Sequence, residues 1–148
     1  MRAGAIFVAL GALVGVFASI ALGVLREDGR RAAELRIEPT APGGPEGVGV
    51  LEHADGRLTG WIVVWGLEPG TRHAVHFHGP DSACGRKADP VAVHPDLEAG
   101  RDGVVAVHLD VGAPETALEA GTYYNVHAAP SSEPDNPEIA CANVEPAP

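Results

Sequence analysis

Two histidines separated by one residue, His76 and His78, are the part of this sequence best suited to chemistry. The segment that holds them has the character of a β-strand, in which alternate residues point to the same side, so both imidazoles face one way. Two imidazoles about 7 Å apart on one rigid strand share a metal ion if a third ligand comes from elsewhere. The alternative interpretation is a pair of surface histidines on a half-buried strand.

Further histidines supply candidates for the missing ligand. His127 follows an aromatic-rich strand segment and completes a three-imidazole set with His76 and His78, and His94 is a candidate fourth ligand. Imidazole suits copper and zinc, and this all-nitrogen set favours copper, with zinc as the second choice. His73 falls on the opposite face of its strand, where we expect a buried, hydrogen-bonded core histidine.

The two cysteines, Cys84 and Cys141, each follow one of the histidine segments. A small even number of cysteines in a chain expected to be exported indicates one disulfide. On the chain-entropy model, that bond stabilises the fold by roughly 4 kcal/mol. The alternative, a pair of thiolate metal ligands, lacks the close Cys-x-x-Cys spacing that zinc sites usually show.

The elements that must position these residues are strands. Turn signals recur about every eight to twelve residues and helical periodicity is absent, which predicts an all-β sandwich or barrel. An Asp55-Gly56 pair predicts a hairpin turn. The expected strands are Val48–Glu52, Arg57–Gly66, Arg72–His78, Val91–Val93, Val104–Val111, Thr122–His127 and Glu138–Val144.

The strand Arg57–Gly66 is apolar on both faces, so we expect it to be central, with Trp61 and Trp65 in the core. Two long connections, Gly79–Pro95 and Ala128–Pro137, each begin directly after a candidate metal-binding histidine. Long loops on a compact domain often carry function, so we expect both loops to surround the site.

The chain of 148 residues has room for one folded domain with appendages. Residues 1–25 are predicted to be a transmembrane anchor or a cleaved signal segment, since the run from Ala3 to Leu25 is uncharged and apolar. Residues 26–47 are expected to be a polar, Pro/Gly-rich linker, residues 48–144 the β-domain, and residues 145–148 a disordered tail.

The location and partners follow from charge and cysteine content. The arginines after the apolar run would by themselves favour a cytoplasmic C-terminal side, but the cysteine pair favours export. We therefore expect an extracytoplasmic protein of the cell envelope or periplasm, either membrane-anchored or secreted. A net charge of −10 argues against nucleic acid as a partner, because phosphate binding needs a basic face. The oligomeric state is left open.

The order of these motifs resembles that of the Cu/Zn superoxide dismutase family. The segment Gly66–His78, with its Gly-Leu turn followed by His-Ala-Val-His-Phe-His, is similar to the family's His-Gly-Phe-His-x-His signature. Asn125-Val126-His127 followed by Ile139-Ala140-Cys141 is similar to the family's Val-His and Leu-Ala-Cys-Gly segments. The resemblance extends from about Gly56 to Val144.

The resemblance implies a Greek-key β-sandwich, of the superoxide dismutase-like and immunoglobulin-like kind, after one N-terminal hydrophobic helix. It implies copper ligation by His76, His78 and His127, a bridging or zinc-side role for His94, and a loop-fixing disulfide between Cys84 and Cys141. The implied reaction converts superoxide, the small-molecule substrate, to dioxygen and hydrogen peroxide. In that reaction His94 would deliver a proton and Arg86 would attract the anion.

The chain also departs from the family. Its zinc loop offers His94, with Asp81, Asp89 or Asp96 as carboxylates, so we expect a reduced zinc site. Glu138 stands where the family has its active-site arginine, and a carboxylate there would repel superoxide. The segment around His127 is also reminiscent of CHRD-type domains. The alternative function is therefore a non-catalytic copper- or zinc-binding module, or a CHRD-like β-sandwich.

Overall fold

The computed structural model describes residues 30–80, 82–86 and 89–146, which form an almost entirely β unit. The expected apolar segment at residues 1–25 lies outside these residues. No helix in the described ranges is long and apolar enough to span a bilayer. The elements are β1 (Arg31–Pro39), β2 (Glu46–Ala54), β3 (Arg57–Trp65), β4 (Arg72–His73), β5 (Val75–His78), β6 (Pro90–Val93), β7 (Leu97–Glu98), β8 (Val105–Gly112), the 3-10 turn η1 (Glu115–Leu118), β9 (Tyr123–His127), β10 (Glu138–Asn143) and β11 (Glu145–Pro146).

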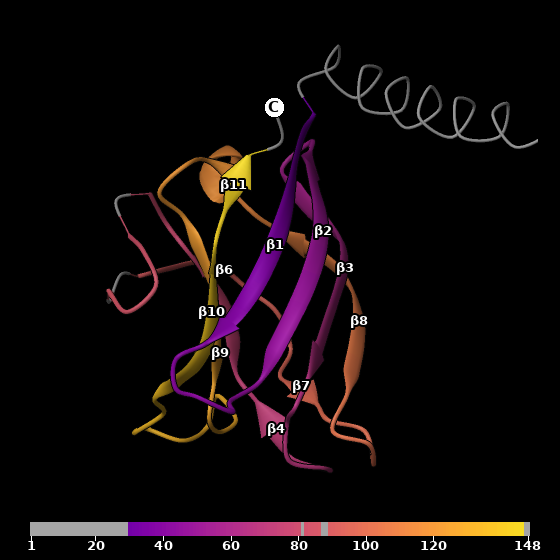
Figure 1. The fold of residues 1–148 in the computed structure, drawn as a ribbon. Coiled ribbons are helices and arrows are strands. Elements are labelled where there is room, and N and C mark those ends of the chain that lie inside the picture. The colour runs from indigo at the N-terminus through magenta and orange to yellow at the C-terminus, as the bar shows by residue number, and fades with distance from the viewer. Residues whose placement is uncertain (1–29, 81, 87–88, 147–148) are drawn as a thin grey trace, which may run out of the picture. The chain divides into compact units, whose positions relative to one another are not determined.

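The strands form a curved sheet that almost closes on itself. Hydrogen bonding runs in the order β6-β5-β9-β10-β1-β2-β3-β8, and β11 pairs with β1. The two ends of this order, β6 and β8, contact each other. Figure 1 shows β1, β2, β3 and β8 as one wall facing the wall that contains β10, β9 and β6. Strands β4 and β7 pair separately at one end. The predicted all-β, sandwich-like architecture is confirmed at this level.

The interior is filled by alternate residues from both walls, as a pleated sheet requires. The β2–β3 hairpin turns at Asp55 and Gly56, whose φ angles of 51° and 73° fit the predicted tight turn. The largest fully buried side chains are Tyr124, Phe77, Ile37, Leu51, Leu58 and Ile62.

Strand β1 corrects the prediction of a linker at residues 26–47. Residues Arg31–Pro39 pair with β2 along most of their length and with β10 at their end. Ala33, Leu35 and Ile37 are buried, whereas the residues between them are exposed. This alternation was present in the sequence, but its charged residues and the following Pro/Gly stretch resemble a spacer. The predicted tail also begins with a strand, since β11 pairs with β1.

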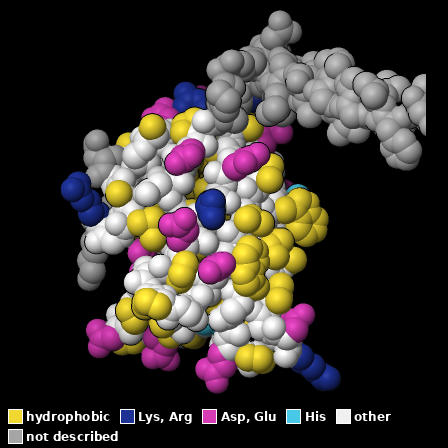
Figure 2. All heavy atoms as spheres, in the orientation of Figure 1, with side chains coloured by type: hydrophobic (Ala, Val, Ile, Leu, Met, Phe, Trp, Pro, Cys, Tyr) yellow, Lys and Arg dark blue, Asp and Glu magenta, His cyan; other side chains and the backbone are white. Residues whose placement is uncertain are grey.

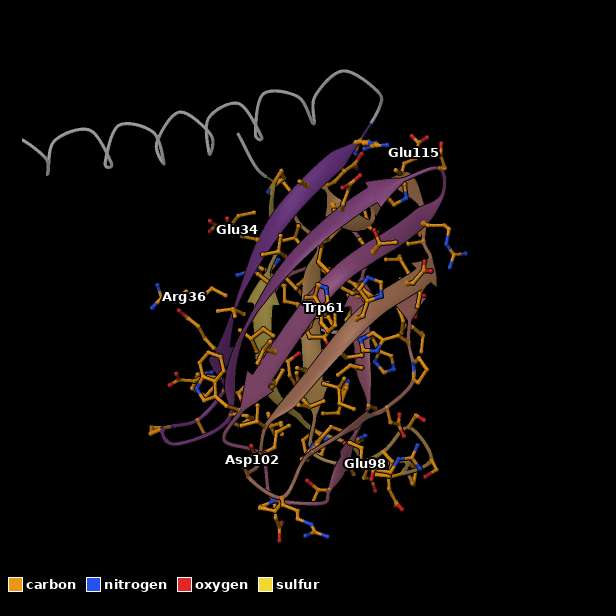
Figure 3. The ribbon with its side chains drawn as sticks, turned by 90° about the vertical axis from the view of Figure 1, so that its right-hand side faces the viewer. Glu34, Arg36, Trp61, Glu98, Asp102 and Glu115 are labelled. Carbon is orange, nitrogen blue, oxygen red and sulfur yellow. A yellow bond between two sulfur atoms is a disulfide. The ribbon has the colours of Figure 1, made fainter. Side chains whose placement is uncertain are left out.

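The prediction that Trp61 and Trp65 lie in the core is wrong. Trp61 is 58% exposed and Trp65 38% exposed, whereas Ile62 and Val64 between them are buried. Figure 3 shows Trp61 on the outer surface of the β1-β2-β3-β8 wall, and Figure 2 shows apolar side chains gathered over the same strands. The opposite wall covers only the inner face of β3, so an apolar outer face remains in solvent. The central position of β3, between β2 and β8, is confirmed.

Replacing Leu35 with alanine tests the structural role of β1. Leu35 is 2% exposed, so Leu35→Ala should lower the free energy of unfolding by about 2–5 kcal/mol, as expected for a truncated core residue. The neighbouring exposed residue provides the control, because Arg36→Ala should change stability by less than about 0.5 kcal/mol. Urea unfolding followed by tryptophan fluorescence measures both. Equal, small effects would contradict the assignment of β1 to the core.

Candidate metal centre

Three histidines from β5 and β9 converge on the outer face of the sheet. Register places His76 opposite Asn125 and Val75 opposite Val126, so His76, His78 and His127 share one face while Val75 and Val126 face the core. One nitrogen from each of the three imidazoles lies within 4.8 Å of the other two. The predicted convergence of the three imidazoles is confirmed at this level.

Burial favours the neutral form of His76. His78 is 6% exposed, and His76 and His127 are half-buried. Burial lowers the pKa of His76, and the neighbouring His127 and His78 lower it further, against an opposing effect of Asp96. A neutral imidazole has a nitrogen lone pair for a metal, so this environment suits ligation.

The orientation of His127 is fixed by backbone groups. Its Nδ1 lies 2.7 Å from the carbonyl oxygen of Asn136, which can only accept, so Nδ1 carries the proton. The lone pair is then on Nε2, where the Asn125 amide nitrogen approaches to 2.8 Å. A ring N–H donated to a backbone carbonyl is typical of metal-binding histidines, because it fixes tautomer and ring plane.

His73 is a buried, hydrogen-bonded histidine, as predicted. It is 4% exposed, its Nδ1 lies 2.8 Å from the carbonyl oxygen of His127, and its Nε2 lies 2.7 Å from the Thr71 hydroxyl. The residue therefore holds the backbone of a candidate ligand and does not itself join the group.

His78 is held by stacking. Its ring lies on that of Tyr123, with centroids 4.5 Å apart and planes 10° from parallel, and the Tyr123 hydroxyl donates to the carbonyl oxygen of Arg86 at 2.8 Å. The Nε2 atom of His78 is buried without a hydrogen bond, while the residue makes other interactions. Stacking thus connects the ligand strand to the loop that follows it.

The donor set fits copper or zinc. Three neutral imidazoles are a ligand set that either ion accepts, with room for a further ligand. The fit comes from the nitrogens of His76, His78 and His127 and from the fixed tautomer of His127. The geometry alone does not distinguish the two ions.

The predicted disulfide is present. Cys84 and Cys141 are bonded, with Cα atoms 5.7 Å apart, which excludes their role as thiolate metal ligands. Cys141 lies opposite Asn125 in the sheet, and the amide of Gly85 donates to the Glu138 carboxylate at 3.3 Å. The first loop is therefore tied to β10 beside the three histidines. A disulfide is typical of proteins in oxidising compartments outside the cytoplasm.

His94 does not join the group, contrary to the predicted role as a fourth or bridging ligand. It is 5% exposed, and its Nδ1 donates to the carbonyl oxygen of Pro95 at 3.0 Å. Its Nε2 accepts from the Tyr124 hydroxyl at 3.2 Å, and the two rings stack with planes 3° from parallel. Tyr124 belongs to the core, so His94 is drawn toward the interior.

The charged residues near the site lie in two places. Arg86, the predicted superoxide-attracting cation, is exposed in the first loop, where its backbone carbonyl oxygen rather than its guanidinium contacts Tyr123. Glu138 is half-buried and lies opposite His127 in the β9–β10 register. Burial, followed by the negative charge of Glu138, raises the pKa of Tyr123. Of the two charged residues, Glu138 is the one that pairs directly with a candidate ligand, His127.

Sequence reasoning missed Asn125 and Asn136. Asn125 lies two residues before His127 on the same face of β9, so strand alternation alone could have placed it beside the histidines. Asn136 acts through its backbone carbonyl, for which no sequence signal exists.

No protein-family model matches this sequence. No curated protein matches it either.

The buried His94 predicts a pH dependence of stability. Burial, as the largest cause, lowers its pKa to about 4, below the ordinary value of 6.5, so the unfolded chain takes up a proton that the folded protein resists. Above about pH 6.5, the lowered pKa of His94 does not reduce the free energy of unfolding. As the pH falls from 6.5 toward 4, that free energy decreases by at most about 3 kcal/mol because the unfolded chain is protonated first.

Replacement of His94 by glutamine, which keeps an acceptor for Tyr124, should flatten the unfolding free energy between pH 6.5 and 4. Denaturant unfolding at several pH values measures the slope. The exposed His108→Gln variant should keep the wild-type slope, and a wild-type slope in His94→Gln would show that His94 titrates normally.

Proposed function

We propose that this protein is an extracytoplasmic, copper-binding, superoxide dismutase-like protein that converts superoxide to dioxygen and hydrogen peroxide. The observation that carries the proposal is the convergence of His76, His78 and His127 from two paired strands. The motif order in the sequence supports the same family, and the disulfide supports an oxidising compartment.

The strand connections are consistent with the Greek-key fold that this family has. The chain runs from β5 to β6 and then to β8, and β9 returns to pair with β5, the first strand of that run. In a Greek key, a fourth strand returns to lie beside the first of three consecutive, hairpin-connected strands. Here β8 contacts β6 but pairs with β3, so the matching feature is the return of β9 to β5. The same return brings His127 beside His76 and His78, so topology and site support one another.

The residues of the chain have distinct roles in this proposal. Copper, when bound, would supply the one-electron chemistry by which one superoxide is oxidised to dioxygen and another is reduced, with two protons, to hydrogen peroxide. His76, His78 and His127 hold the ion. Asn136 and His73 keep His127 in position through its ring and its backbone. The disulfide ties the loop that follows His78 to β10, the strand that pairs with β9.

The geometry supports one metal rather than two. Both ring nitrogens of His94 are hydrogen-bonded. Among the candidate carboxylates, Asp96 pairs with Arg72 and accepts from the Ser131 amide, and Asp89 is exposed. Asp81 lies outside the described residues. Among the described residues, His94 lies outside the group formed by His76, His78 and His127, so the proposal contains a single copper site.

A non-catalytic metal-binding module is the second candidate function. It is favoured by Glu138, which adds negative charge where the reaction needs an anion to approach, in a chain with a net charge of −10. The two candidates share the three-histidine site. They differ in whether the metal-loaded protein consumes superoxide.

Metal loading tests the site itself. The purified protein should bind about one Cu(II) per chain, with EPR splitting from several nitrogen ligands, because three imidazoles converge. His78→Ala or His127→Ala should weaken binding by more than about 100-fold, since even outer-shell changes cost 10- to 100-fold. His108→Ala, which removes an exposed histidine on β8, should leave binding unchanged. Equal binding by all variants would refute the site.

Charge substitution at Glu138 tests the catalytic proposal. Glu138→Gln keeps an acceptor for the Gly85 amide but removes the charge, so superoxide consumption by the copper-loaded protein should rise by about 2- to 5-fold at low ionic strength. Added salt should raise the wild-type rate because it screens repulsion.

Glu34→Gln is the matched control for Glu138→Gln. It removes one exposed acidic charge from the outer face of β1, on the other wall of the sheet, and should leave the rate unchanged. A copper-loaded protein that stays inactive in both variants would favour the non-catalytic module.

A further inference from the structure

Asn125 connects two of the three candidate ligands. It is 2% exposed and lies on β9, on the same face as His127. Its Oδ1 accepts a hydrogen bond from the backbone amide of His76 at 3.2 Å, and its Nδ2 lies 2.8 Å from Nε2 of His127. This carboxamide is hydrogen-bonded to Nε2 of His127, the nitrogen that a metal would need.

The direction of each hydrogen bond around Asn125 follows from its neighbours. A backbone amide can only donate, so the atom facing His76 is the Asn125 oxygen and the atom facing His127 is the nitrogen. The carbonyl oxygen of Asn136 fixes the proton of His127 on Nδ1. Nε2 therefore accepts from the Asn125 amide, and its lone pair is the one that a metal would take.

We propose that Asn125 is the anion-binding residue of this site. In the metal-free protein its amide nitrogen is bonded to Nε2 of His127, so a metal that binds there must displace it. When a metal takes Nε2 of His127, the Asn125 amide nitrogen is displaced from that atom and loses its acceptor. The released N–H then serves an anionic ligand of the metal. This inference rests on the proposed metal site, but not on catalysis.

The electrostatic surroundings give this amide its importance. Glu138 lies opposite His127 on the paired strand β10, and Arg86 is in an exposed loop. A neutral donor that is already fixed in a buried position binds an anion without a large cost in side-chain entropy. Asn125 thus provides, by hydrogen bonding, the anion-binding role that the family's arginine has in the resemblance.

Two variants separate the predicted effects. Asn125→Leu has a similar shape and removes both hydrogen bonds, whereas Asn125→Asp keeps the acceptor for His76 and removes the donor. Asn125→Leu should bind Cu(II) and Zn(II) about 2- to 10-fold more tightly than wild type, since one competing hydrogen bond is removed. Asn125→Asp should bind them more tightly still, because its added carboxylate also attracts the cation. Both should bind azide to the copper-loaded protein about 10-fold more weakly, as followed by the azide-to-copper absorption band.

Opposite changes in the two affinities identify the role. A purely structural role would weaken metal and azide binding together, and that outcome would overturn the proposal, as would unchanged azide affinity in both variants. Asn143→Asp makes the same amide-to-carboxylate change on β10, where Asn143 contacts the Cys84 amide, and should alter neither affinity by more than about 2-fold.

The experiment also separates this proposal from the proposed function. A wild-type protein that binds copper and azide but consumes no superoxide would remove the catalytic function and leave the Asn125 comparison valid. A wild-type protein that binds neither copper nor zinc would overturn both.

Discussion

The antiparallel register between β5 and β9 is the constraint on which the site depends. It sets His76 opposite Asn125 and Val75 opposite Val126, so one set of side chains enters the core while the other faces outward. A shift of one residue in β5 would exchange its two faces, so that His76 and His78 would enter the core beside Tyr124 and Phe77 would face outward. The apolar core therefore enforces the arrangement of the candidate ligands.

The two loops that follow β5 and β9 are fixed to the sheet by different means. The first is held by the disulfide and by hydrogen bonds to Glu138 and Asn143 on β10. The second presents the carbonyl oxygen of Asn136 to His127. Rigid strands supply the ligands and anchored loops orient them, which is the division of roles that a preorganised metal site requires.

Electrostatics separates this site from an efficient anion-capturing one. The carboxylate of Glu138 lies opposite His127 in the β9–β10 register, so the approach of an anion, such as the superoxide of the proposed function, is opposed by local charge as well as by the net charge. The buried carboxamide of Asn125 offers hydrogen bonding without charge. In the proposed function, Glu138 acts on the reaction rate through its charge, whereas Asn125 acts on metal and anion affinity through its hydrogen bonds.

The sequence by itself determined the local patterns. Alternation put His76 and His78 on one face, Asp55-Gly56 specified a hairpin turn, and two cysteines allowed a single internal pair. The tertiary structure decided what depends on distant partners. Only strand pairing shows that β1 belongs to the sheet, and only the position of the opposite wall leaves Trp61 exposed. His94 was misassigned because its direction depends on Tyr124, and Asn125 was missed because its partners come from the β5–β9 register. Short-range spacing fixes which face a residue occupies, whereas long-range packing fixes what it meets there.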